Sequence, residues 1–137
     1  MSKAAGRFVA IISIIALCLS ATNLYLTTNS KKETQYVVYL GTNHKDTNEP
    51  VYVGDEAKQK VDDILTKYFS GWTISDAKGG WTNEDGTISH EYTVVIYLSD
   101  TTLDKVHEAS NDLIDVFSQN SILIQSNETK TEFYSGK

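Results

Sequence analysis

The stretch that decides the fold is Tyr92-Thr93-Val94-Val95-Ile96-Tyr97-Leu98, in which nearly every residue is apolar or aromatic. A second stretch, Tyr36-Val37-Val38-Tyr39-Leu40, has the same character. Successive side chains of a strand point to opposite faces, so a sheet with one face in water alternates apolar with polar residues. Because neither stretch alternates, we expect both to be strands in the middle of a sheet that is covered on both faces.

Two amphipathic helices are expected between the strands. In Asp55–Phe69, apolar residues recur at helical spacing (Ala57, Val61, Ile64, Leu65 and Tyr68). The second helix is expected to follow the capping residues Ser99-Asp100-Thr101 and to end near Gln119. Its inner stripe consists of Leu103, Val106, Ala109, Leu113, Val116 and Phe117.

Two further strands complete the pattern. Trp72–Trp81 is expected to be extended, and Gly79-Gly80 predicts either a bulge or a close approach of another part of the chain. A turn at Asn83-Glu84-Asp85-Gly86 joins it to the long strand Thr87–Leu98. Ser121–Ser126 is the last predicted strand, and Thr129–Tyr134 is a candidate extension past a turn at Asn127.

The element order predicts an α+β, ferredoxin-like βαββαβ domain, preceded by an N-terminal apolar helix. Right-handed crossovers place both helices on one face of a four-stranded antiparallel sheet, with the two apolar strands as the central pair. The opposite face then lacks a cover, although apolar side chains that stay in water forgo several kcal/mol. We expect an interface there, formed by a second copy, another protein or a small hydrophobic ligand, at Val37, Tyr39, Thr93, Val95, Tyr97 and Trp81.

The first residues differ from the rest of the chain. Lys3 and Arg7 precede an apolar run from Phe8 to Leu19 that continues more weakly to Leu26. This layout is typical of a secretory signal peptide, and residues 8–26 also approach the length of a membrane anchor. We therefore expect a signal peptide or anchor over 1–26, a polar tether over 27–35 and an extracytoplasmic domain over 36–137, secreted or membrane-anchored. A lipid anchor at Cys18, the only cysteine, is weakened by the bulky Leu17 before it.

Charge argues against one class of partner. From Tyr36 onward the chain has eight basic and 17 acidic residues, a net charge of −9. Such a surface repels phosphate backbones, so nucleic acid is not expected as a partner. The exported part has no cysteine, so its stability must come from its core.

Few residues suggest catalysis. Glu91 and Asp76 flank the Gly-Gly-Trp segment and are the best candidates for a pair of catalytic carboxylates, with His90 as a neighbouring candidate. His90 and Glu91 are adjacent on a strand and should point to opposite faces. The three histidines (His44, His90 and His107) lack the short spacing of a metal site, so neither a metal nor a cofactor is expected.

One segment resembles a known family. The run Gly71-Trp72-Thr73-Ile74-Ser75-Asp76-Ala77-Lys78-Gly79-Gly80-Trp81, followed by Asp85-Gly86 and Glu91, resembles the exported bacterial family called domain of unknown function 3574. The likeness covers Tyr36 to Phe133 and also includes Gly41. Two positions depart from the family pattern: Ala77 replaces a common glycine, and Thr82 replaces a frequent basic residue. The resemblance implies export and an α+β fold, and it implies no activity.

Three functions remain open at this stage. The leading hypothesis is a non-catalytic extracytoplasmic interaction module that self-associates through the open sheet face. The second is a small enzyme of the ferredoxin-like dimeric barrel type, with Tyr39, Tyr97, Trp81, His90 and Glu91 in a pocket between two sheets. The third is a binder of a small aromatic or hydrophobic ligand on the same face.

Overall fold

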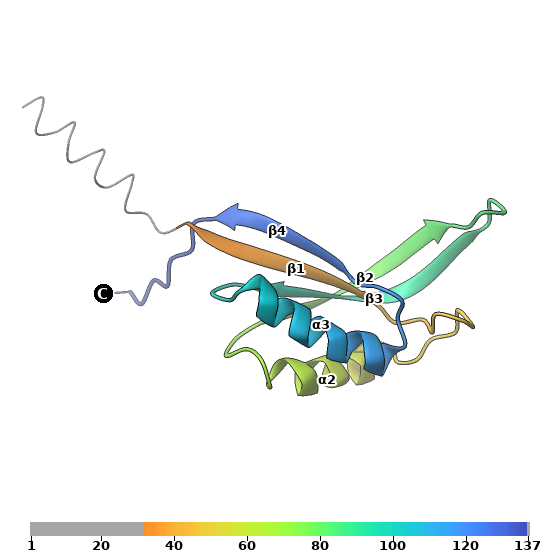
Figure 1. Ribbon diagram of the computed structural model, residues 1–137, viewed down its shortest axis with the longest axis horizontal. Coiled ribbons are helices and arrows are strands. Elements are labelled where there is room, and N and C mark those ends of the chain that lie inside the picture. The colour runs from red at the N-terminus through yellow and green to blue at the C-terminus, as the bar shows by residue number, and fades with distance from the viewer. Residues whose placement is uncertain (1–31, 137) are drawn as a thin grey trace, which may run out of the picture. The chain divides into compact units, whose positions relative to one another are not determined.

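The computed structural model describes residues 32–136, which form a two-layer α+β domain (Figure 1). Its elements follow the order β1 (Glu33–Gly41), α2 (Gly54–Leu65), β2 (Thr73–Thr82), β3 (Ile88–Leu98), α3 (Leu103–Phe117) and β4 (Leu123–Thr129). This is the predicted βαββαβ order, and the ferredoxin-like fold is confirmed. The predicted leader, residues 1–26, and residues 27–31 of the predicted tether lie outside the described residues.

All strand pairs are antiparallel, in the order β2-β3-β1-β4. The two apolar strands, β1 and β3, are therefore the central pair, as their pattern predicts. Their register places Tyr36 opposite Leu98, Val38 opposite Ile96 and Leu40 opposite Val94. Residues directly opposite each other share a face of the sheet, so this register gathers one parity of both strands on one side.

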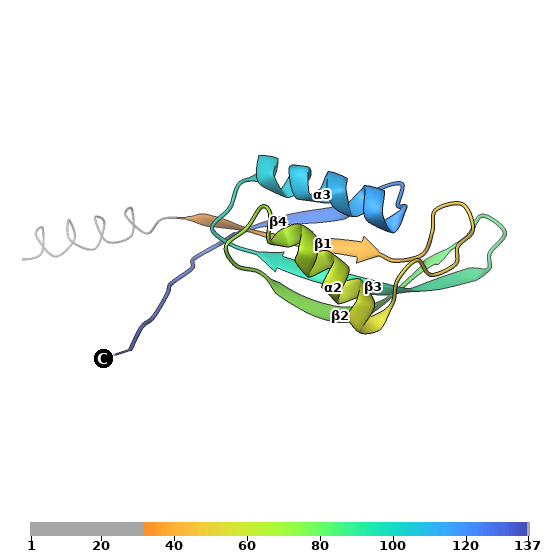
Figure 2. The same ribbon diagram turned by 90° about the horizontal axis from the view of Figure 1, so that it is seen from below.

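Both helices cover that side, and Figures 1 and 2 show that neither α2 nor α3 lies on the other face of the sheet. The helices contribute apolar stripes that meet the central strands. Phe117 is buried, and its ring centre lies 5.4 Å from that of Tyr52 in an edge-to-face arrangement. The core consists of Tyr36, Val38, Leu40, Ala57, Val61, Ile64, Leu65, Val94, Ile96, Leu98, Val106, Ala109, Leu113 and Phe117.

The ends of several elements differ from the predictions. β1 begins at Glu33, so the last three residues of the predicted tether belong to the sheet. α2 ends at Leu65 and is therefore shorter than the predicted helix, which ran to Phe69. The residues from Leu65 to Phe69 form hydrogen-bonded turns instead. β4 runs through Asn127 to Thr129, where a turn was expected, because its residues pair with β1 without a break.

Local chemistry explains where α3 begins and ends. The hydroxyl of Thr102, one residue after the predicted capping group, accepts a hydrogen bond from the backbone N–H of Lys105. Ser118 takes a left-handed conformation at the other end, and its N–H bonds back to Asp115.

Within residues 32–136, neither helix combines the length and the apolar character that crossing a membrane requires.

The core predicts a contrast between two phenylalanines. Phe117→Ala should lower the free energy of unfolding by about 3–5 kcal/mol, because a fully buried ring leaves a cavity. Phe133→Ala is the control: Phe133 is 83 % exposed, and its loss should cost less than about 0.5 kcal/mol. Chemical denaturation followed by circular dichroism measures both. Equal costs would contradict the described core.

Candidate functional site

The sheet face opposite the helices is almost free of charge. Register assigns to it the odd-numbered residues of all four strands. Between Glu33 at one end and Glu91 towards the other, none of them is charged, although the domain is strongly acidic. We call this area the charge-free face. It consists of Gln35, Val37, Tyr39, Thr73, Ser75, Ala77, Thr93, Val95, Tyr97, Leu123, Gln125 and Asn127.

The charge-free face exposes less apolar surface than the sequence pattern implies. Val37, Thr93 and Val95 are buried within the single chain. The Tyr39 hydroxyl donates to Gln125 Oε1 at 3.2 Å. Because Gln125 lies opposite Val37, the Tyr39 side chain extends along the sheet towards Val37. Exposure is concentrated at Tyr97 (38 %) and Leu123 (58 %). The expectation that all these apolar side chains need an outside cover is thus corrected: neighbouring side chains already cover three of them.

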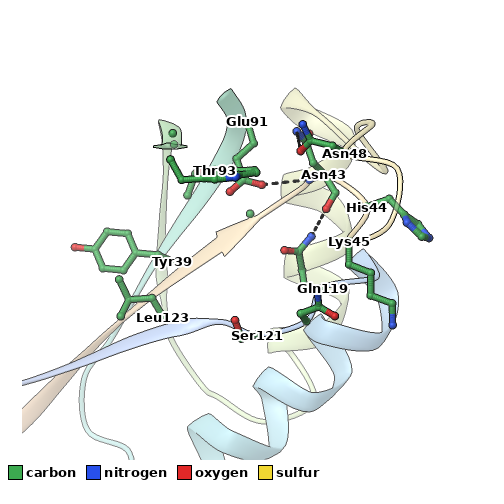
Figure 3. A pocket seen from close by; sticks show the side chains of 15 residues that line it. Tyr39, Asn43, His44, Lys45, Asn48, Glu91, Thr93, Gln119, Ser121 and Leu123 are labelled. Carbon is green, nitrogen blue, oxygen red and sulfur yellow. Dashed lines mark hydrogen bonds between the residues drawn. The ribbon is translucent and has the colours of Figure 1, made fainter. Parts of the chain in front are cut away.

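A pocket of about 610 Å³ lies at one end of this face (Figure 3). The ends of β1, β2 and β3 form its floor, and the loop after β1 and the segment between α3 and β4 form its walls. Among the sequence-predicted site residues, Tyr39, Trp81, Glu91 and Thr93 line it.

Glu91 occupies a gap that two glycines leave in the sheet surface. Gly79 lies opposite Glu91 on β2, and Gly41 lies on β1 opposite Thr93. A Cβ atom added at Gly41 would lie 2.6 Å from Glu91 Cδ, and one at Gly79 would lie 3.2 Å from Glu91 Cγ. The Glu91 side chain therefore lies against the backbone of both neighbouring strands, an approach that only glycine permits.

The loop after β1 is held rigidly beside Glu91. The backbone N–H of Asn43 donates to Glu91 Oε2 at 3.4 Å. Asn43 is itself buried, and its side-chain amide donates to the carbonyl of His90 and to Asn48 Oδ1. Gln119 Nε2 donates to the carbonyl oxygen of Asn43, as Figure 3 shows. Three segments far apart in sequence thus fix the amide that faces the carboxylate.

Asp76 and Glu91 do not form a carboxylate pair. Asp76 lies opposite Val94, on the helix-covered face, whereas Glu91 lies on the open face. Asp76 Oδ1 accepts a hydrogen bond from the Tyr92 hydroxyl at 2.8 Å and lies 3.6 Å from Lys58 Nζ. Partial burial raises the pKa of Tyr92, and the hydrogen bond to Asp76 raises it further. The environment of Asp76 is a polar contact between β2, β3 and α2.

The remaining predicted site residues are also dispersed. His90 lies on the other face of the sheet from Glu91, as adjacent strand residues must, but both residues line a second pocket of about 380 Å³, together with Lys78 and Tyr92. Tyr97 lies near the other end of the sheet. Trp81 lines the Glu91 pocket, and its indole N–H donates to Asn83 Oδ1 at 2.9 Å. Within residues 32–136, no group of three or more His, Cys, Asp or Glu is placed to hold a metal ion.

Sequence reasoning missed Asn43 and Gln119. Both follow regular elements, Asn43 after β1 and Gln119 after α3, and both come to the end of the sheet where the pocket lies. The available signal was their position just beyond the ends of the strand and the helix. Nothing in the local sequence identified Glu91 as their common neighbour.

Comparison with known proteins agrees with the resemblance seen in the sequence. Residues 35–133 match the family described as protein of unknown function (DUF3574). No curated protein matches the chain. Four of the residues on which the resemblance rests, Gly41, Gly79, Trp81 and Glu91, line the pocket.

Two structures of a phage SAM lyase show the same fold at low identity. A phage SAM lyase in complex with S-methyl-5'-thioadenosine is 17 % identical, with 75 % of this chain and 93 % of that chain covered and a TM-score of 0.52. The apo state of a phage SAM lyase is 16 % identical over 76 % and 94 % of the chains, with a TM-score of 0.54. The divalent ion tolerance protein CutA1 from Ehrlichia chaffeensis is 18 % identical over 76 % and 88 %, with a TM-score of 0.49.

The gap around Glu91 predicts the effect of filling it. Gly41→Ala should lower the free energy of unfolding by about 1 kcal/mol, because the new methyl group displaces the Glu91 carboxylate and breaks its hydrogen bond with the Asn43 amide. Gly71→Ala is the matched control: a Cβ there meets nothing within 4 Å and should cost less than about 0.5 kcal/mol.

A double variant makes the cause specific. If the collision is with Glu91, then Gly41→Ala should cost less in a Glu91→Ala background than in the wild type. Urea denaturation of the four proteins in this cycle measures the coupling. A cost of Gly41→Ala that is the same in both backgrounds would show that Glu91 is not the obstacle.

Proposed function

Since this chain belongs to the DUF3574 family of proteins of unknown function, we propose that it is an extracytoplasmic, non-catalytic interaction module that self-associates through its charge-free face. The observation that supports this best is the absence of charge between Glu33 and Glu91 on one sheet face of a domain with a net charge of −9. Charged residues are depleted at the centres of protein interfaces, and aromatic residues such as Tyr39 and Tyr97 are enriched there.

The charge distribution favours a second copy as the occupant. A basic partner would be attracted to the helices, which carry eight acidic and three basic residues. The charge-free face offers such a partner no attraction. It is instead the surface on which a body of the same negative charge can approach with the least repulsion. Two identical faces also meet by two-fold symmetry, the commonest way in which soluble proteins form dimers.

The placement of the polar candidates supports binding over catalysis. Asp76 and His90 lie on the helix side of the sheet, while Glu91 lies on the open side. General acid–base chemistry needs its groups within hydrogen-bond reach of one reacting centre. His90 and Glu91 both line the smaller pocket, but no hydrogen bond within residues 32–136 joins any two of Asp76, His90 and Glu91.

Self-association predicts the effect of a new charge. Tyr97→Asp places an unpaired negative charge in the proposed interface, which should weaken association by more than about tenfold without unfolding the domain. Val116→Asp is the control: Val116 on α3 has the same 38 % exposure as Tyr97 but lies on a helix, outside the open face. Light scattering on the purified proteins measures the mass. A wild-type monomer, or a Tyr97→Asp protein that still dimerises, would contradict the proposal.

Export is proposed on the basic start and apolar run of residues 3–19. A β-lactamase fused after Lys137 should protect a bacterial host from ampicillin, because the enzyme works only outside the cytoplasm. Replacing two apolar residues of the run, Ile11→Asp and Ile14→Asp, should abolish this protection, since charges block membrane insertion. Export by this segment would be contradicted if both fusions protected the host equally, or if neither fusion protected it.

A further inference from the structure

The carboxylate of Glu91 lacks a counter-charge in the described residues. No basic side chain among residues 32–136 forms an ion pair with it, and its one hydrogen bond, from the Asn43 amide, is long at 3.4 Å. A carboxylate can accept about four hydrogen bonds. Most of the hydrogen-bond acceptor sites of the Glu91 carboxylate are therefore available to a ligand in the pocket.

Three large apolar or aromatic side chains share the pocket with polar side chains of the loop after β1 and of the segment after α3. Tyr39 comes from β1, Trp81 from β2 and Leu123 from β4, and all three line the cavity around Glu91. The volume of about 610 Å³ lies within the range of small-molecule sites. Figure 3 shows Tyr39 and Leu123 on one side of the cavity and Asn43 with Gln119 on the other.

We propose that this pocket binds an organic monocation, a primary ammonium group carried on an aromatic body. The ammonium would pair with Glu91 and take up its free lone pairs, with a strong charge-assisted hydrogen bond. The aromatic body would pack against Tyr39, Trp81 and Leu123, and the rings of Tyr39 and Trp81 also attract cations. The acidic domain would raise the local concentration of cations near the pocket.

Other ligand classes match the walls less well. A metal ion needs several oxygen or nitrogen ligands, and Glu91 is the single carboxylate that lines this pocket. An anion would meet the Glu91 charge directly. The basic residues of the lining, His44 and Lys45, lie on the far side of Asn43 from Glu91 in Figure 3, and His44 points away from the cavity.

The pocket shares Tyr39, Thr93 and Leu123 with the charge-free face. Its carboxylate, Glu91, lies at the hairpin end of the sheet, whereas Tyr97 lies near the other end. The Tyr97→Asp protein should therefore bind the monocation at least as well as the wild type does. Loss of self-association and loss of ligand binding are thus separable results.

The test is a titration of the purified protein with phenethylammonium, followed by isothermal calorimetry or by NMR shifts. Phenethyl alcohol has the same body without the charge, and ethylammonium has the charge without the ring. We expect phenethylammonium to bind at millimolar concentrations and each of the other two to bind at least about tenfold more weakly. Nα-acetyl-lysine amide represents the lysine side chain of a protein. It should also bind more weakly than phenethylammonium.

Matched variants locate the site. Glu91→Gln keeps the shape and removes the charge, so it should weaken phenethylammonium by at least about tenfold. Asp76→Asn removes a charge from the opposite face and should leave the affinity unchanged. Trp81→Ala should weaken phenethylammonium more than it weakens ethylammonium. Circular dichroism checks that each variant is folded.

Four results would overturn the proposal: no binding of phenethylammonium to the wild type at millimolar concentrations, equal binding of phenethyl alcohol, unchanged affinity of the folded Glu91→Gln protein, or tighter binding of the lysine amide. The last result would assign the pocket to a protein side chain instead of an aromatic amine.

Discussion

The antiparallel pairing of β1 with β3 is the constraint on which the rest of the structure depends. Its register gathers Val38, Leu40 and their partners under the helices, and thereby forms the core. The same register sets Gly41 beside Glu91 and so opens the gap in which the carboxylate lies. A slip of one residue would turn every side chain of a strand to the other face. Core and candidate site are therefore fixed by one set of backbone hydrogen bonds.

Charge is distributed to match this division of faces. The helices carry most of their polar residues as acids towards solvent, while the opposite sheet face is neutral between Glu33 and Glu91. Small polar residues such as Thr73 and Ser75 make up much of that face, and the tyrosines Tyr39 and Tyr97 stand among them. Such a surface is soluble on its own and still allows like-charged copies to meet, which is the balance that a reversible interface needs.

The sequence predicted the fold because two of its signals are local. Unbroken apolar runs identified β1 and β3, helical periodicity identified α2 and α3, and the order of elements then restricted the topology. The site depended on contacts across strands, which local patterns do not encode. Gly79-Gly80 was compatible with a bulge or a close approach, and the continuous register of β2 with β3 identifies the close approach, to Glu91 and Thr93. Likewise, the register of β2 with β3 places Asp76 and Glu91 on opposite faces of the sheet. The hydrogen bond from Tyr39 to Gln125 joins residues that are 86 positions apart in the sequence.

The most direct test of the central claim is the salt dependence of self-association. Two domains of net charge −9 that meet through a face without ion pairs repel each other everywhere else. Screening by salt weakens that repulsion and leaves neutral contacts intact. Sedimentation equilibrium of the purified protein from about 0.05 M to about 0.5 M sodium chloride should therefore show a dimer that tightens as salt rises. A dimer that loosens with salt, or a monomer throughout, would contradict the account.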